Sequence, residues 1–230
     1  MRENFNGIYV IWLRDVRKFF RDKPRMIGAT VQPALYLLIL GNGLSRGFSG
    51  FNPGYGKTSP EYLHFIYPGI IAMTLLFSSV FSAISIVWDR EVGFLKEVMV
   101  APISRWSVAV GKTLGGSTVS MFQGCLMLVF APLIRLDLPW SVILELIPSM
   151  FFISVALTSM GIVIASRMKS MQGFTFITNF IMLPMFFLSG AMFPTRNLPS
   201  WMVLLTSCDP LSYGVDILRK VTLGEGDYPL

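Results

Sequence analysis

Five long runs of apolar residues, nearly free of charge, limit what this chain can fold into. A helix needs about 20 consecutive apolar residues to cross the hydrocarbon core of a bilayer. The chain of 230 residues is 53% hydrophobic and only 14% charged, whereas soluble domains are about 25% charged. The sequence therefore predicts an all-α integral membrane protein. The predicted spans are Met26–Leu44, Phe65–Val87, Thr113–Ile134, Trp140–Ala165 and Gly173–Phe193.

The first 25 residues are polar and basic. They hold seven of the 19 basic residues and lack the short apolar core of a cleavable signal peptide. Apolar residues recur there at helical spacing opposite a basic face, which is typical of a helix lying in the membrane interface. We expect residues 1–25 to form such a helix, ended by Pro24, either as a positive anchor or as an elbow that also contacts a cytoplasmic partner. The apolar face is Phe5, Ile8, Trp12, Val16 and Phe19, and the basic face is Arg14, Arg17, Lys18 and Arg21.

Between the second and third runs, Trp88–Lys112 carries a dense mixture of both charge signs. Gly93 and Pro102 bracket a short amphipathic segment within it. A few polar residues are enough to join two spans, so a charged helical loop of this size predicts a docking element for a cytoplasmic protein. The expected polar contacts are Glu91, Glu97 and Arg105, and the expected apolar surface is Phe94, Leu95 and Met99.

The third run begins with small residues beside a lysine. Gly111 and Gly115 have the GxxxG spacing, with Gly116 next to them, and this spacing predicts close helix packing. We expect Lys112 to extend toward water at the cytoplasmic interface. The Gly-Lys pair is also part of the phosphate-binding loop motif, but Trp106 stands where that motif needs its first glycine. No nucleotide site is therefore expected in this chain.

Serine residues recur along one side of the second run, and they allow two interpretations. Small polar residues let helices approach closely and hydrogen-bond to one another, or they line a polar track for a substrate. The fifth run adds an amide and two aromatic rings as pathway candidates, although aromatic residues in a bilayer more often pack. The candidates for a substrate pathway are Ser78, Ser82, Phe176, Asn179 and Phe180.

The residues after the fifth run contain apolar pieces that are too short to cross a bilayer. Non-helical backbone at membrane depth needs cover from protein or a water-filled cavity. We therefore expect residues 194–220 to form a re-entrant hairpin on the outer face, without a sixth span after it. Short cytoplasmic loops are enriched in Lys and Arg. The seven basic residues of the N-terminus and the three of residues 88–105 accordingly place both segments on the cytoplasmic side of a multi-pass protein.

The residue inventory argues against a metal site and against an enzyme embedded in the membrane. His64 is the only histidine, and Cys125 and Cys208 lack the spacing of metal ligands. The runs hold almost none of the acids, bases and nucleophiles that catalysis within the bilayer requires. The basic residues follow the ends of the runs, which indicates topology rather than a nucleic-acid-binding surface. We expect no metal, no cofactor and no nucleic-acid partner.

Two sequence patterns and the basic N-terminal helix together point to a known family. The first pattern is the order Glu91, Gly93, Glu97, Pro102, Arg105 and Gly111-Lys112. The second is the run over residues 188–219, which includes LSGAMFP and DPLSYGVDILR. Over nearly its whole length the chain resembles the membrane subunit of bacterial ABC exporters of the ABC-2 permease type. It departs from that family in Asp209, where asparagine is usual, and in the absence of a sixth span.

The resemblance implies a single ABC-2 transmembrane domain over residues 1–230, with five of six expected spans and a coupling helix over residues 92–101 within the docking segment 91–105. It implies a homodimer in the bacterial cytoplasmic (inner) membrane, driven by separate ATPase subunits that bind ATP and Mg. The chain itself is then not an enzyme, and its cargo is lipophilic, lipid-linked or a polysaccharide. An ion-coupled secondary transporter or channel is the alternative, although such proteins usually carry ionisable groups near the midplane and internal repeats.

Overall fold

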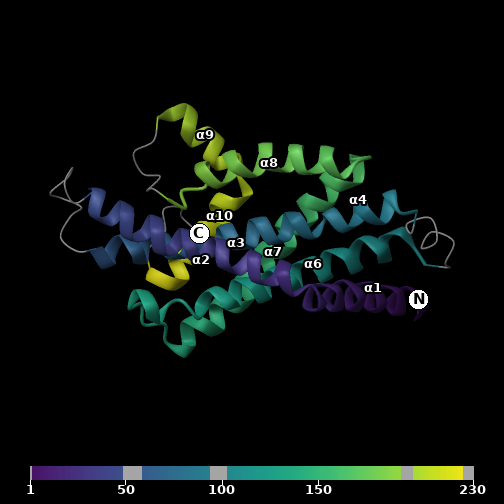
Figure 1. Ribbon diagram of the computed structural model, residues 1–230, viewed down its shortest axis with the longest axis horizontal. Coiled ribbons are helices and arrows are strands. Elements are labelled where there is room, and N and C mark those ends of the chain that lie inside the picture. Colours follow the sequence, from purple (N-terminus) through teal and green to yellow (C-terminus); the bar gives the residue numbers. More distant parts are fainter. Residues whose placement is uncertain (1, 49–58, 94–102, 193–198, 225–230) are drawn as a thin grey trace.

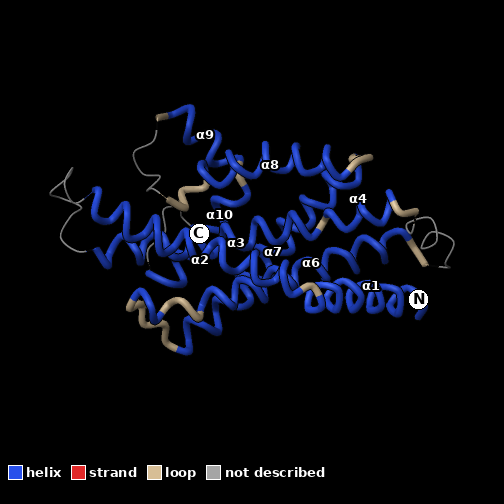
Figure 2. The backbone as a smooth tube through the Cα atoms, in the orientation of Figure 1, coloured by secondary structure: helices blue, strands red, loops and turns tan. Residues whose placement is uncertain are grey.

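The computed structural model describes residues 2–48, 59–93, 103–192 and 199–224, and the regular structure within these ranges is helical throughout (Figures 1 and 2). Most helices run along the long axis of the molecule, as expected of a membrane bundle. The elements are α1 (Arg2–Arg21), α2 (Lys23–Phe48), α3 (Ser59–Ser82), α4 (Ile84–Glu91), α6 (Arg105–Leu128), η1 (Pro132–Ile134), α7 (Trp140–Arg167), α8 (Met171–Leu188), α9 (Ser200–Cys208) and α10 (Pro210–Leu223).

Four helical segments of the described chain are long and apolar enough to cross a membrane, which confirms the predicted all-α membrane class. A shorter apolar stretch, Met26–Ile39, lies in α2, where the first span was predicted. Pro24 stands in the first turn of α2, where a proline is tolerated because the missing N–H has no helical partner there. The four long segments are Leu63–Glu91, Arg105–Ile134, Trp140–Arg167 and Met171–Leu188.

The second span consists of two helices, α3 and α4, that follow one another end to end (Figure 1). The helical pattern is interrupted at Ala83, whose N–H bonds to the Val80 carbonyl at 3.1 Å. Next to it, the Ser82 hydroxyl donates to the Ser79 carbonyl at 2.7 Å. A serine that bonds back to its own helix in this way competes with the backbone ladder and favours a local bend.

Helix α3 is the centre of the bundle and packs against α2, α6, α7 and α10. Its large side chains Tyr67, Leu75 and Leu76 are fully buried. The Tyr67 hydroxyl donates to the Met127 carbonyl of α6 at 3.1 Å, so this buried polar group is satisfied. The apolar core therefore forms around the second span.

Helix α1 lies along α6 (Figure 1). Trp12 Nε1 donates to Thr118 Oγ1 of α6 at 3.0 Å. A Cβ atom added at Gly111 would lie 3.0 Å from the Ile11 Cβ, so the close packing predicted from the glycine spacing is confirmed. Within the predicted apolar face of α1, Phe19 is buried against the bundle, while Phe5 is 71% exposed, as expected of a side chain that faces lipid. The helix packs against α6 through Ile11, beside Gly111, and through Phe19, beside Phe122.

Four of the five tryptophans are exposed near the two ends of the bundle. Trp88 and Trp106 flank the connection between α4 and α6 at one end, whereas Trp140 begins α7 and Trp201 lies in α9 at the other (Figure 1). Tryptophan is enriched at both membrane–water interfaces. These positions therefore support spans that cross the bilayer between the two sets.

Helix α8 ends at Leu188, five residues before the predicted end of the fifth span at Phe193. The chain turns at Gly190, where φ is +73° and a side chain would be strained. This turn is held by Arg219 of α10, whose Nη2 donates to the Gly190 carbonyl at 2.8 Å. The same guanidinium lies 4.1 Å from the ring centre of Phe65. Arg219 thereby ties α10 to α3 and to the end of α8.

The predicted outer hairpin corresponds to α9 and α10 within residues 199–224, while residues 193–198 lie outside the described part. The Thr206 hydroxyl of α9 contacts the Leu188 carbonyl at 3.2 Å. Helix α10 packs against α3 and α7. Two short helices joined at Asp209 are compatible with a re-entrant hairpin, and its depth in the membrane stays a prediction.

Asp209 is expected to make the stability of this hairpin depend on pH. Its carboxylate caps α10 by accepting from the Leu211 N–H at 2.9 Å and from the Ser212 hydroxyl at 3.3 Å. Burial raises the pKa of Asp209 from 3.8 to about 6, more than these two hydrogen bonds lower it. The folded state then binds the proton more tightly than the unfolded state. Its contribution to stability is greatest below pH 4 and is lost as the pH rises through 6.

We predict that Asp209→Asn removes this dependence, because asparagine is also a good cap and carries no charge. A shift of about two pKa units corresponds to roughly 3 kcal/mol at most. The melting temperature of D209N minus that of the unchanged protein, measured in nanodiscs, should rise between pH 4.5 and 7.5 by on the order of 5 °C. Parallel curves for the two proteins across this range would contradict the prediction.

Candidate functional site

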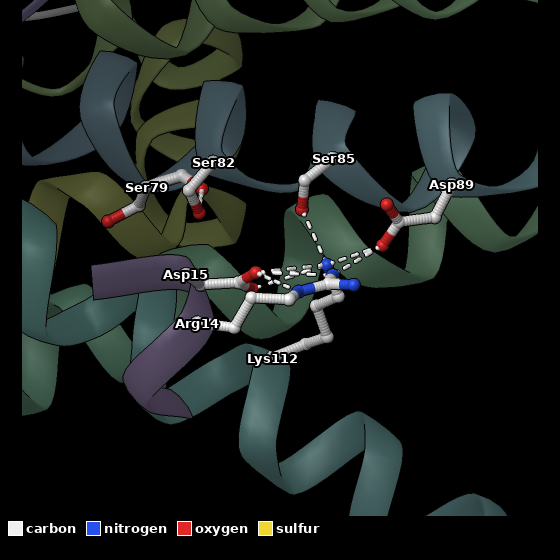
Figure 3. A network of polar contacts seen from close by, with 7 residues as sticks. All are labelled: Arg14, Asp15, Ser79, Ser82, Ser85, Asp89 and Lys112. Atoms are coloured by element: carbon white, nitrogen blue, oxygen red, sulfur yellow. Dashed lines mark hydrogen bonds and ion pairs between the residues drawn. The ribbon is translucent and has the colours of Figure 1, made fainter. Parts of the chain in front are cut away.

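Four charged side chains from three helices meet at one point of the bundle (Figure 3). Lys112 Nζ of α6 lies 2.8 Å from Asp89 Oδ2 of α4 and 3.2 Å from Asp15 Oδ2 of α1. Arg14 Nη2 of α1 lies 2.7 Å from the same Asp89 oxygen and 3.3 Å from Asp15 Oδ1. Lys112 also donates to the Ser85 hydroxyl at 3.0 Å. We call Arg14, Asp15, Asp89 and Lys112 the ion cluster.

Lys112 and Asp89 are buried at the centre of the ion cluster, at 6% and 7% exposed, whereas the Arg14 side chain at its edge is 35% exposed. Burying a single charge costs several kcal/mol, so such groups are tolerated only when they are paired and hydrogen-bonded. Here two cations face two carboxylates, and the cluster is neutral as a whole. Its geometry therefore requires α1, α4 and α6 to stay in one relative arrangement.

The structure overturns two expectations from the sequence. Lys112 does not extend toward water, because two carboxylates from other helices solvate its ammonium inside the bundle. Trp88–Lys112 is also not a single loop, since α4 continues to Glu91 and α6 begins at Arg105. The connection between the helices is therefore shorter than predicted, and both of its ends are helical.

The end of α4 is bonded to the connection between α7 and α8. Arg90 donates to the backbone carbonyls of Ser166 and Met168. Glu91 accepts the backbone N–H of Met171 at 2.9 Å. A displacement of this end of the α4–α6 connection is therefore transmitted to α8 as well as to α3.

The other end of the connection is bonded to α1. The Ser104 N–H donates to the side-chain oxygen of Asn4 at 3.0 Å. Ser104 in turn caps α6 by accepting the Ser107 N–H at 3.2 Å. The two ends of the segment therefore contact different helices. Further along the bundle, the ion cluster joins α1 to α4 and α6.

The predicted docking residues fall partly within the described structure. Glu91 is exposed, and Gly93 follows α4 with φ at +82°, a conformation that favours glycine. Arg105 is exposed in the first turn of α6. The remaining docking candidates, Phe94, Leu95, Glu97, Met99 and Pro102, lie outside the described residues. The docking role of all eight stays a prediction.

The serine candidates for a substrate pathway face neighbouring helices. The Ser120 hydroxyl of α6 contacts the Ser78 hydroxyl at 3.1 Å. Ser82 packs against Gly116, since a Cβ at that glycine would clash with the serine hydroxyl and lie 2.7 Å from Thr158 Cγ2. These contacts favour the helix-packing interpretation, while Ser78 also lines a cavity.

The pathway candidates of the fifth span lie elsewhere. Phe176 and Phe180 are 75% and 74% exposed on α8, and Asn179 between them is exposed as well. None of these three residues lines the cavity that contains Ser78. The structure therefore does not bring the two groups of candidates together within one chain, and a substrate role for either group stays a prediction.

Within the described ranges, no group of three or more His, Cys, Asp and Glu side chains is placed to hold a metal ion. The two carboxylates of the ion cluster are instead engaged by Lys112 and Arg14. The ion cluster is therefore better suited to holding the helices in one arrangement than to binding a metal or to catalysis.

Comparison with known proteins decides the family. The profile of the ABC-2 type transporter family matches residues 6–223. The chain belongs to the ABC-2 type transporter family. It is therefore a membrane-spanning subunit of an ABC transporter, and the alternative of an ion-coupled carrier or channel is set aside.

Individual relatives of this ABC-2 chain carry different names. The putative transport permease ycf38 of Cyanophora paradoxa is 28% identical over 210 residues, which cover 88% of this chain and 70% of the relative. The probable multidrug ABC transporter permease YbhR of Escherichia coli K12 is 30% identical over 71% of this chain and 45% of its own length. Nodulation protein J of Rhizobium leguminosarum bv. viciae is 24% identical over 87% of this chain and 75% of its own.

Proposed function

We propose that this ABC-2 chain is the permease subunit of an ATP-driven exporter in the bacterial cytoplasmic membrane. A separate ATPase subunit docks on residues 91–105, and the cargo is lipophilic, lipid-linked or a polysaccharide. The observation that carries the proposal is that the described ends of this segment are both hydrogen-bonded, Glu91 to α8 and Ser104 to α1, while the ion cluster joins α1, α4 and α6. The basic residues near the N-terminus and in this segment support a cytoplasmic position for both.

Because both ends of residues 91–105 are hydrogen-bonded to other helices, a displacement of this segment moves those helices. A push from the ATPase reaches α8 through Glu91 and α1 through Ser104. Asp89 and Lys112 then couple α4 to α6, because separating them would leave buried charges unpaired. Closure of the ATPase subunits thus moves the helices together, as a rigid-body rotation rather than as a local loop change.

The proposed pathway lies between two copies of the chain. Helix α8 presents an exposed apolar face, formed by Phe176, Phe180, Leu183 and Phe187. These positions recur at helical spacing and so form one stripe. A second copy packed along this stripe would place Asn179 and the aromatic rings beside a cargo path. The exposure of this face within one chain supports this placement.

We predict that Glu97→Lys lowers co-purification of the ATPase, and the ATP turnover that the permease stimulates, by roughly tenfold, because a reversed charge is repelled where a salt bridge was made. The experiment co-expresses the permease with candidate ATPases from its own genome in nanodisc-compatible detergent. Glu145→Lys is the matched control, since Glu145 is an exposed glutamate near the start of α7, at the opposite end of the bundle.

The two substitutions separate docking from a general effect of charge. Loss of ATPase binding in E97K with normal binding in E145K supports the docking segment. Unchanged binding and turnover in E97K would remove residues 91–105 as the docking site. Failure of every candidate ATPase to bind the unchanged permease would remove the proposed partner altogether.

A further inference from the structure

A cavity of about 350 Å³ lies between α1, α2, α3, α4 and α6. Its volume falls at the lower end of the range of about 300–1,000 Å³ that is usual for small-molecule sites. Helix α3 supplies more of the wall than any other helix, mainly through Met73, Phe77 and Phe81, and α1 contributes Phe19. Phe77 and Phe81 are stacked with ring centres 6.2 Å apart. The wall thus offers aromatic and thioether groups to an apolar occupant.

The chemistry of the wall limits what the cavity can hold. None of the residues that line it carries a charge. A charged group placed there would lose its hydration without gaining a counter-ion, which is costly. A polysaccharide would need many hydrogen-bonding partners, whereas most of the lining is apolar. The occupant that fits is a ring system or an acyl-chain segment of an uncharged lipophile.

Gln123 adds one specific polar feature. This residue of α6 lines the cavity and is 1% exposed. Its Nε2 is one of the few buried side-chain atoms of the described residues that have no hydrogen-bond partner. A buried donor without an acceptor costs free energy. An occupant with an acceptor oxygen beside Nε2 would satisfy this donor and remove that cost.

The three helices that form the ion cluster also line the cavity. Phe19 follows Asp15 by one turn of α1, and Val119 follows Lys112 by two turns of α6, so each pair lies on one face of its helix. Ile84 of α4 lines the cavity next to Ser85, which accepts a hydrogen bond from Lys112. An occupant therefore contacts the same three helices that the docking segment moves.

We propose that this cavity binds an uncharged lipophile, with its apolar part against Phe77 and Phe81 and a carbonyl oxygen accepting a hydrogen bond from Gln123. Either a bilayer lipid, through an acyl ester, or a small aromatic cargo carries this chemistry. Binding itself is independent of export. Only the step from bound ligand to cargo rests on the proposed function.

The test uses the permease alone in nanodiscs that contain a diacylglycerol, an uncharged lipid with acyl esters, that carries a diazirine on one acyl chain. After photolysis, mass spectrometry measures labelling of α3 and α6 peptides. Phe77→Trp fills the cavity and is expected to lower this labelling at least fivefold. Phe180→Trp is the matched control, because Phe180 is exposed on α8 and does not line the cavity. If F77W does not fold, Ala29→Leu fills the cavity from α2.

Gln123→Leu tests the hydrogen bond, since leucine keeps the approximate size and removes the amide. We expect about fivefold weaker labelling, the loss of one ordinary hydrogen bond. The melting temperature should not fall, because the lost amide has no partner in the empty protein. A merely structural role for Gln123 would lower the melting temperature instead. Unchanged labelling in Q123L would overturn the carbonyl contact.

Two dyes test whether a small aromatic ligand shares the cavity with acyl chains, and whether a cationic ligand is excluded from it. Nile red, an uncharged ring system with a carbonyl, should displace the photolipid label, whereas the cationic rhodamine 6G should not. Displacement by both dyes alike would overturn the preference for uncharged ligands. Labelling that neither dye displaces would assign the cavity to acyl chains and overturn a site shared with cargo. Equal labelling of α3 and α6 in the unchanged protein and both cavity-filling variants would overturn the site itself.

Discussion

Replacing Lys112 with methionine should destabilise the protein by roughly 3–5 kcal/mol, the range found when one partner of a buried ion pair is removed. Methionine keeps the length of the side chain. Among the described residues it leaves Arg14 as the one cation that lies within 4 Å of both Asp15 and Asp89. The buried site then carries a net negative charge. The melting temperature of K112M in nanodiscs should fall on the order of 10 °C.

The matched control removes a cation and an anion together. In Lys112→Met with Asp89→Asn, the pair between Arg14 and Asp15 remains, and the site is neutral again. We expect the double variant to recover at least half of the lost melting temperature, although it carries one more substitution. A double variant that is less stable than K112M would show that the ion cluster acts through packing or separate hydrogen bonds rather than through charge balance.

The helical architecture could be predicted from the sequence because the length and composition of each apolar run indicate a membrane-spanning helix without information from the rest of the chain. The start of α7 at Trp140 is an example, since Pro139 lacks an N–H and favours the position just before a helix. The start of α6 was misplaced because a lysine ordinarily marks the end of a span. Here the carboxylates of Asp15 and Asp89 solvate Lys112, so the helix extends back to Arg105.

The ion cluster itself could not be predicted, because its members come from three helices far apart in the sequence. Lys112 lies 97 residues from Asp15 and 23 from Asp89. One signal was present, however. Asp15 is an acidic residue on a helix rich in Arg and Lys, and it lies one turn from both Ile11 and Phe19, which are buried. An acid on the apolar side of an interfacial helix indicates a buried cation as its partner.

Gly69→Ala should destabilise the protein by about 2 kcal/mol or more, because the added methyl has no space. A Cβ at Gly69 would lie 2.8 Å from the Ala191 Cα and closer still to its carbonyl oxygen. Both atoms belong to the backbone of the turn after α8, which Arg219 holds through the Gly190 carbonyl. The turn cannot move away without breaking this hydrogen bond, and overpacking of this kind costs about 1–3 kcal/mol or more.

Gly28→Ala provides the comparison, because a Cβ at Gly28 in α2 meets nothing within 4 Å. Alanine is a better helix former than glycine by up to about 1 kcal/mol, so G28A should melt at the same temperature as the unchanged protein or slightly above it. G69A should melt on the order of 5 °C lower. If both variants melted alike, the close contact between α3 and the Gly190–Ala191 turn would not be a constraint on the fold.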